Sequence, residues 1–283
     1  MRIQFLGTAA AEGMPAVFCN CEACSRAKTS GGKNIRTRSQ ILVNGNVLLD
    51  FPPDTYFHAI THCLDLSAIK DLFITHAHPD HCSPMELIVR GSPYAHKMTE
   101  PVLNIHASKT VLDRIDSIIG AEFKIQARET VRMRAITPYE SVRLAAPNGH
   151  DLTVTSLPAE HTVGEHCFIY LLEEKGATFL QFNDSGILPD EVYAFLKKRK
   201  VKIDAVAFDC TYGYFKKGKG RHMGFLDAQE ERARMERFGI LQKKCACILT
   251  HFSHNSGYMH DEMQAKVKDS GFLVAYDGME IVL

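Results

Sequence analysis

The segment Thr75-His76-Ala77-His78-Pro79-Asp80-His81 constrains the fold of this chain more than any other. It ends a compact apolar run that begins at Asp71 and predicts a buried strand. An extended His-x-His places both imidazoles on one side, and a turn after a strand can aim several side chains inward. Asp80 and His81 add ligand types suited to a second cation. The segment therefore predicts a metal site at a strand end; the alternative is a polar turn whose histidines only cap the strand.

Hydrophobic patterning predicts short strands with helices between them. Asn44-Gly45-Asn46 and Glu173–Ala177 are hairpin signals. One helix is expected to be capped by Asp227 and stopped by Gly239. The pattern indicates one α/β domain spanning the whole chain, with two sheets covered by helices. The expected strands are 2–6, 40–43, 46–50, 71–75, 102–106, 152–157, 167–172, 177–182, 205–209, 246–250, 272–275 and 279–283, and the expected helices are 190–200 and 227–238.

Composition restricts the class of protein. The chain has 283 residues, 45% hydrophobic and 23% charged, with 33 basic and 33 acidic side chains. This apolar fraction supports a large core and excludes a disordered chain. A formal net charge of zero argues against a protein that coats nucleic acid. No apolar run approaches the roughly 20 residues that span a membrane, and the N-terminus lacks signal-peptide features, so no membrane partner and a cytoplasmic location are expected.

The cysteines and histidines point to metal binding. The chain has 9 cysteines and 14 histidines, and cytosolic cysteines favour metal ligation over disulfides when they cluster. Three of them form Cys19-Asn-Cys21-Glu-Ala-Cys24, inside a stretch, residues 7–38, that is expected to be a loop too irregular for a buried element. A tetrahedral zinc site would anchor such a loop. The alternative is three loop thiols without a partner, open to oxidation.

The motif His-x-His-x-Asp-His after an apolar strand resembles the metal-ligand motif of the metallo-β-lactamase superfamily. Leu157–His161, Phe182–Gly186 and Leu249–His251 resemble the later ligand segments of that family, in the same order. The resemblance implies an α/β fold, a four-layer αββα sandwich of two mixed β-sheets flanked by helices. It also implies one metal bound by His76, His78 and His161, a second bound by Asp80, His81 and His251, and Asp184 as the bridge between them.

Two positions near these ligands keep alternative interpretations. His150 and His166 lie close to His161 in the sequence, and His166 could be the ligand instead, or a core residue. Asp50 resembles a family aspartate near the metals and is expected to hydrogen-bond a ligand imidazole. It could equally initiate the turn at Phe51-Pro52-Pro53.

N-terminal residues narrow the resemblance. Phe5–Thr8, Gly13–Ala16 and the three-cysteine motif resemble the PhnP-type phosphoribosyl 1,2-cyclic phosphate phosphodiesterases of the carbon–phosphorus lyase pathway, as do Leu249–His254 and Tyr276–Ile281. In that family a histidine three residues after the last catalytic histidine completes a Cys3His zinc site. The matching position is His254, for which a solvent-exposed loop residue is the alternative. The resemblance thus implies one structural zinc held by Cys19, Cys21, Cys24 and His254.

This resemblance implies a metal-dependent phosphodiesterase acting on a small cyclic phosphodiester. Attack would come from a hydroxide bridging two divalent ions, because metals lower the pKa of water; Mn²⁺, Zn²⁺, Ni²⁺ and Fe²⁺ all suit the ligands. The expected catalytic residues are Asp80 and His222. Gly220-Arg221-His222 resembles a family segment whose histidine contacts phosphate and donates a proton to the leaving alkoxide. The basic run Lys216–Arg221 could attract the phosphate, or could be a solvated loop with an incidental histidine.

Three other functions stay open: a tRNA 3′-processing nuclease, a thioester or lactam hydrolase, and a non-catalytic metal-binding protein like those of PQQ biosynthesis. Neutral charge and the lack of a long RNA-binding insertion disfavour the nuclease, and seven matched ligands favour an enzyme over the binder. Extra sequence around 85–145 and a longer turn between His161 and Tyr170 depart from the cyclic phosphodiesterases and leave the substrate open. A homodimer is expected by analogy alone.

Overall fold

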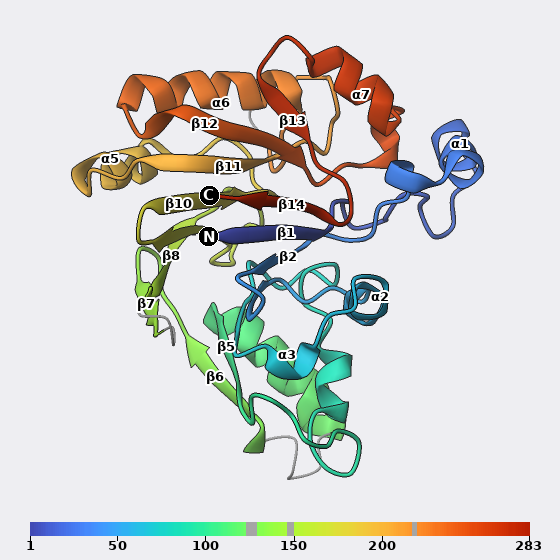
Figure 1. Cartoon of the computed structure of the whole chain (residues 1–283), viewed down its shortest axis with the longest axis vertical. Helices are drawn as coiled ribbons and strands as arrows, with labels where there is room; N and C mark the ends of the chain where they lie inside the picture. Colours follow the sequence, from blue (N-terminus) through green and yellow to red (C-terminus); the bar gives the residue numbers. More distant parts are fainter. Residues whose placement is uncertain (123–128, 146–149, 217–219) are drawn as a thin grey trace.

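The computed structural model of the chain contains two seven-stranded β-sheets packed face to face, with helices on their outer faces (Figure 1). The structure describes residues 1–122, 129–145, 150–216 and 220–283. Each sheet combines three antiparallel with three parallel strand pairs. The expected four-layer αββα sandwich with two mixed sheets is therefore confirmed. No helix in the described ranges combines the length and apolar character of a membrane span.

Most of the first sheet comes from the N-terminal half of the chain, and the second sheet comes from the C-terminal half (Figure 1). In spatial order, the first sheet consists of β14 (Met279–Val282), β1 (Arg2–Gly7), β2 (Gln40–Val43), β3 (Val47–Leu49), β4 (Asp71–Phe73), β5 (Leu103–Ala107) and β6 (Val131–Ala135). The second consists of β13 (Phe272–Val274), β12 (Leu241–Thr250), β11 (Ile203–Asp209), β10 (Ala177–Phe182), β9 (Phe168–Glu174), β8 (Leu152–Pro158) and β7 (Ser141–Leu144). The helices are α1 (Glu22–Ser30), α2 (Thr55–Thr61), α3 (Lys109–Glu122), α5 (Asp190–Lys198), α6 (Phe225–Phe238) and α7 (His260–Val267), with short 3₁₀ turns at Gly32–Asn34, Leu66–Ala68, Pro84–Val89 and His254–Ser256.

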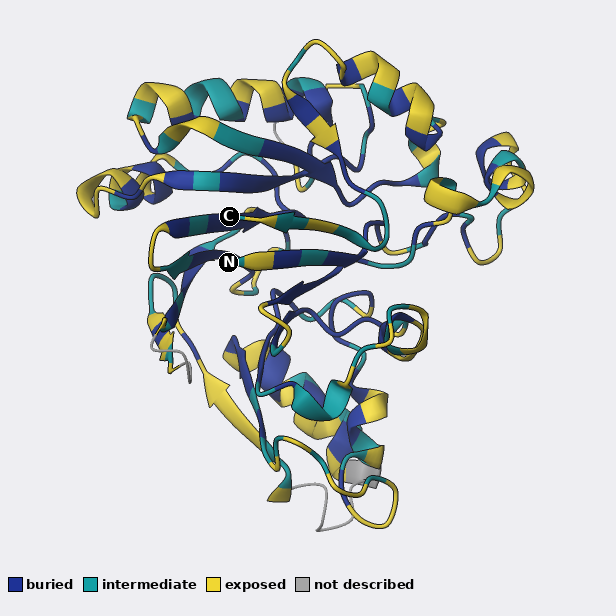
Figure 2. Ribbon diagram, in the orientation of Figure 1, coloured by how far each residue is buried: buried dark blue, intermediate teal, exposed yellow. Residues whose placement is uncertain are grey.

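Successive side chains of a strand point to opposite faces of the sheet, so one apolar strand contributes side chains to two cores. Val47 and Leu49 of β3 belong to the core between the sheets, whereas Leu48 packs into the core beneath α3. In β9, Tyr170 faces the inner core and Ile169 faces the core beneath α5 and α6. Strands covered on both faces are therefore apolar throughout. The central strands are accordingly buried along their length (Figure 2).

The structure corrects two expectations. Residues 7–38 are not irregular throughout, because α1 lies within them and buries Ala23, Cys24 and Ala27. The N-cap of helix α6 is Gly224 and not Asp227. Asp227 is the third residue of the helix, and its carboxylate accepts the backbone N–H of Gly224 at a distance of 3.0 Å. Its expected end at a left-handed Gly239 is confirmed.

The stretch 85–145, for which the sequence predicts only the strand at 102–106, contains β5, α3, β6, β7 and a 3₁₀ turn. Helix α3 covers the outer face of the first sheet through Val111, Ile115 and Ile119. Arg128, part of this extra sequence, lies outside the described residues. Strand β6 forms an exposed edge of its sheet (Figure 2).

Candidate metal centre

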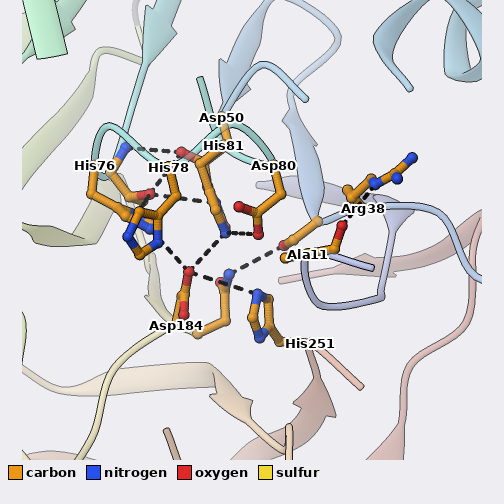
Figure 3. Close-up of polar contacts among 12 residues, drawn as sticks. Ala11, Arg38, Asp50, His76, His78, Asp80, His81, Asp184 and His251 are labelled. Atoms are coloured by element: carbon orange, nitrogen blue, oxygen red, sulfur yellow. Dashed lines mark hydrogen bonds and ion pairs between the residues drawn. The ribbon is translucent and has the colours of Figure 1, made fainter. Parts of the chain in front are cut away.

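The expected metal ligands gather at the ends of strands from both sheets (Figure 3). Asp50 follows β3 and the segment 76–81 follows β4, its parallel neighbour. Asp184 follows β10, Asp209 ends β11 and His251 follows β12, and these three strands are also parallel. Because parallel neighbours end at the same edge of a sheet, residues far apart in the sequence meet there.

Backbone geometry at this edge is unusual. Asp50, Asp184 and His251 have positive φ angles of 67°, 56° and 60°. Left-handed conformations are uncommon for residues with a side chain and cost of the order of 1–3 kcal/mol each. Each lies within two residues of a strand end and joins the same cluster. Strain repeated at three positions of one cluster is typical of a functional site.

His76, His78, His161 and Asp184 form the first group of potential ligands, with one ligand atom of each lying within 4.8 Å of all the others. His161 Nε2 is 3.1 Å from His78 Nδ1, and His76 Nε2 is 3.2 Å from Asp184 Oδ2. His166 is exposed and joins no such group among the described residues. The structure thus brings His161, rather than His166, to this position.

Asp80, His81, Asp184 and His251 form the second group, within the same limit. His81 Nε2 is 2.8 Å from Asp184 Oδ2 and 3.1 Å from Asp80 Oδ2, and His251 Nε2 is 3.7 Å from Asp184 Oδ2 (Figure 3). Burial opposes protonation of His81, but Asp50, Asp80 and Asp184 outweigh it and raise its pKa, so metal binding there is coupled to loss of a proton. Asp184 belongs to both groups, as a bridging carboxylate must.

Unsatisfied atoms show that these residues fit a metal. Within the described part of the chain, four buried atoms of these ligand groups make no hydrogen bond of normal geometry, although other ligand atoms lie close to them: His76 Nε2, His81 Nε2, His251 Nε2 and Asp184 Oδ1. Leaving such an atom unpaired costs about 1–3 kcal/mol. Burial, aided by His81, lowers the pKa of His76. Burial raises the pKa of Asp184, but the imidazoles of His251 and His76 outweigh it and hold that pKa well below its ordinary value. A neutral imidazole and an ionised carboxylate are the forms that bind metals.

Asp50 supports the second group. Its Oδ2 lies 2.7 Å from His81 Nδ1, and its Oδ1 accepts the backbone N–H of Thr75 at 2.8 Å and the Thr75 hydroxyl at 2.9 Å. The side chain is buried. A carboxylate against the far nitrogen of a ligand imidazole fixes the orientation and tautomer of the ring. The structure thus places Asp50 against a ligand imidazole.

His222, expected from the sequence, is held by Asp209, which the sequence did not single out. His222 Nδ1 lies 3.1 Å from both Asp209 Oδ2 and Asp184 Oδ1. Burial opposes protonation of His222, but the hydrogen bond and charge of Asp209 outweigh it and raise the pKa of His222 to about 9. Buried Asp209 also accepts the backbone N–H groups of Thr211 and Met223. These bonds make it a partner of His222 rather than a free ligand; its only sequence signal is an acid at the end of an apolar strand.

Two further supports carry no recognisable sequence signal. Glu165 accepts the backbone N–H of Ala77 at 2.8 Å and so holds the turn between His76 and His78. The Thr211 hydroxyl lies 2.9 Å from Nδ1 of His251. Neither residue is part of a motif, because each acts through a partner distant in the sequence.

The ligand groups open into a pocket of about 570 Å³. Its lining comes from residues 10–12, 211–216, 221–222 and 253–256, together with the ligands themselves. Lys216 and Arg221 of the expected basic run line it, and Lys216 also pairs with Glu230. Lys217, Gly218 and Lys219 lie outside the described residues. The pocket thus joins the metal ligands to two cationic side chains and His222.

The three cysteines and His254 meet beside this pocket. His254 Nδ1 lies 3.4 Å from Cys21 Sγ and 3.8 Å from Cys19 Sγ, and the four ligand atoms lie within 4.8 Å of one another. A tetrahedral zinc ion with Zn–S bonds of about 2.3 Å holds its ligands about 3.8 Å apart. Hydrogen bonds from the backbone of Cys24 and from His254 lower the pKa of Cys21 to about 6, which favours the thiolate that binds metal. The four residues therefore fit a zinc ion.

Comparison with known proteins agrees with this geometry. Residues 46–252 match the family described as "Beta-lactamase superfamily domain". The chain is 24% identical over 309 residues to coenzyme PQQ synthesis protein B of Rhizobium meliloti (strain 1021), covering 100% of this chain and 98% of that one. It is 30% identical over 205 residues to ribonuclease Z of Shouchella clausii (strain KSM-K16), covering 70% and 57%. A solved structure of a diphosphatase from the PhnP family superposes with a TM-score of 0.73 at 20% identity, covering 100% and 97%. The protein belongs to the metallo-β-lactamase superfamily.

Proposed function

We propose that the protein is a phosphodiesterase that uses two divalent metal ions to hydrolyse a small, cyclic phosphodiester. His76, His78 and His161 would hold one ion, Asp80, His81 and His251 would hold the other, and Asp184 would be shared between them; the cysteine cluster would hold a structural zinc. The placement of His222 carries this proposal, because it puts an imidazole held by Asp209 in the pocket beside both groups. Hydrolysis of a phosphodiester expels an alkoxide that needs such an acid.

When bound, divalent ions lower the pKa of water and neutralise charge on a phosphoryl oxygen. The chain supplies the rest. Asp209 engages His222 Nδ1, which leaves Nε2 as the nitrogen that donates a proton to the leaving oxygen. Arg221 and Lys216 line the pocket and attract the phosphate. Asp50 and Asp209 hold the imidazoles in place before substrate arrives.

The test is an assay of the purified protein, loaded with Mn²⁺ or Zn²⁺, against bis-para-nitrophenyl phosphate and a ribose cyclic phosphodiester. Chelator-sensitive release of product supports the phosphodiesterase. Hydrolysis of a thioester or lactam without phosphodiester hydrolysis would assign the other chemistry of the superfamily. Silence on every substrate, with both groups loaded by metal analysis, would favour a non-catalytic metal binder.

A tRNA 3′-processing nuclease is the second candidate, favoured by the similarity to ribonuclease Z. It would use the same ligand groups on a much larger phosphodiester. The balance of 33 basic and 33 acidic residues opposes it, since polynucleotide binding needs accumulated positive charge. Cleavage of a precursor tRNA at rates above those for the ribose cyclic phosphodiester would establish it.

A further inference from the structure

Glu12 places a negative charge in the pocket outside both ligand groups. Its side chain is 30% exposed and lines the same pocket as His222, Asp184 and Arg221. The residue lies between β1 and α1, on the segment that leads to the cysteine cluster. An ionised carboxylate there is costly for an enzyme whose substrate is itself an anion, unless the carboxylate meets some other part of the substrate.

The position of this carboxylate is fixed by the neighbouring residues Ser253 and His254. The Ser253 hydroxyl donates to Glu12 Oε1, and His254 Nε2 lies 3.7 Å from the same oxygen. The other ring nitrogen of His254 faces the sulfurs of Cys19 and Cys21. An imidazole that binds metal through one nitrogen presents N–H at the other, commonly toward a carboxylate. Ser253 and His254 therefore position Glu12, and both contacts found among the described residues fall on Oε1, so that Oε2 is the oxygen that can meet a ligand.

Neutral hydrogen-bonding groups share the pocket lining with Glu12. Ser253, Asn255 and Ser256 line the pocket with it, whereas the cationic side chains Lys216 and Arg221 come from a different segment. The pocket lining thus combines two cationic side chains, which suit a phosphate, with the Glu12 carboxylate and neutral amide and hydroxyl groups. An ionised carboxylate only accepts hydrogen bonds, so it selects donors, and it repels any second phosphate.

We infer that Glu12 is a specificity residue that accepts hydrogen bonds from hydroxyl groups of the substrate. The substrate class is then a sugar or polyol phosphodiester with one phosphate, rather than a pyrophosphate or a polynucleotide with adjacent phosphates. This inference rests on the proposed function and narrows its substrate. Glu12 acts in recognition, and the protons of the reaction move elsewhere in the pocket.

Equilibrium binding tests the inference with two matched probes, glycerol 1-phosphate and propyl phosphate, which differ in two hydroxyl groups. Calorimetric titration uses the full chain loaded with Mn²⁺ and zinc. We expect the wild-type protein to bind glycerol 1-phosphate about 10-fold more tightly than propyl phosphate, the gain typical of a hydrogen bond to a charged group. Glu12→Gln should reduce that ratio to within about 2-fold, and the same variant should bind pyrophosphate about 10-fold more tightly than wild type does, because a repulsive charge is gone.

Glu191→Gln is the matched control, because Glu191 is exposed on α5 away from the pocket lining. It should preserve the wild-type ratio. A wild-type ratio near one, a ratio that survives Glu12→Gln, or failure of the loaded protein to bind either probe would overturn the inference. Zinc content and melting temperature of the Glu12 variant show whether the cysteine cluster and the adjoining residues Ser253 and His254 keep their structure. If the wild-type protein hydrolyses no phosphodiester, the proposed function fails, whereas the binding ratio still decides the role of Glu12.

Discussion

The two metal-binding clusters of this protein are built on different supports. At the strand-end centre, His76, His81, Asp184 and His251 are buried and follow the ends of β4, β10 and β12, central strands of two packed sheets. The cysteine cluster lies on a connecting segment, where Cys21 is exposed and precedes the first turn of α1. Ligands at the ends of central strands are held in place by the fold itself, whereas ligands on a connecting segment depend on the bound ion to fix their positions.

Supporting contacts reinforce this difference. At the strand-end centre, Asp50 and Asp209 hold ligand imidazoles from behind, and both carboxylates are themselves fixed by backbone N–H groups. At the cysteine cluster, the sulfurs of Cys19 and Cys24 accept backbone N–H groups from Cys21 and Ala16, at 3.4 and 3.3 Å. Substitutions at the first cluster should therefore alter turnover, and substitutions at the second should alter stability.

Asp184→Ala should have the largest effect on turnover. It removes the carboxylate shared by both ligand groups and leaves the imidazoles of His76 and His161 without their carboxylate partner. We expect at least one active-site ion to be lost and hydrolysis to fall by more than about 10³-fold, measured by elemental analysis and by the nitrophenol assay. Asp190→Ala, on the exposed start of α5, is the control and should retain both ions. An Asp184 variant with full metal occupancy would contradict the bridging role.

His222→Ala should come second, because it removes the proton donor and spares the ligands. We expect both active-site ions to remain bound while turnover falls by about 10²- to 10⁴-fold. The loss should be smaller for nitrophenolate, a leaving group that needs little protonation, than for an alkoxide. His96→Ala, at an exposed position, should behave as wild type. Unchanged turnover on an alkoxide substrate would exclude the acid role of His222.

Asp50→Asn should have an intermediate effect. The amide keeps the shape of the side chain but loses the charge that faces His81 Nδ1. Loss of such a partner typically weakens metal binding by about 10- to 100-fold. Titration with Mn²⁺ followed by activity should show recovery of turnover at high metal concentration. A Mn²⁺ affinity equal to that of wild type would show that Asp50 serves to hold Thr75 and does not support His81 as a metal ligand.

The sequence was most informative where ligands are adjacent or follow clear strands. The segment 76–81 and Asp184 can be recognised as candidate metal ligands from the sequence, because polar residues at the end of an apolar strand are unusual. Strands with turn signals, such as β9 and β10, also lie where patterning placed them. These features are formed by residues close together in the chain, so a single sequence is enough to recognise them.

Features that depend on distant partners were missed. Asp209 and Glu165 gain their roles from residues 13 and 88 positions away in the chain. At α1 the sequence predicts an irregular loop because the segment, with Gly and Lys beside it, has little apolar periodicity; Ala23, Cys24 and Ala27 are buried by tertiary packing. The sequence likewise predicts no element at α3, β6 or β7, whose packing partners lie on other elements.

Cys21→Ser should have the smallest effect on turnover and separates the two clusters most sharply. It removes the thiolate closest to His254 Nδ1, so zinc binding and the order of residues 7–38 should both weaken. Because bound zinc contributes directly to folding free energy, we expect loss of the structural ion and a drop in melting temperature of about 5 °C or more. Turnover of bis-para-nitrophenyl phosphate should change only a few-fold, since the strand-end ligands do not rest on this segment. Normal zinc content and melting temperature would refute a structural site, and a collapse in turnover matching that of Asp184→Ala would mean that the two clusters form a single cooperative unit.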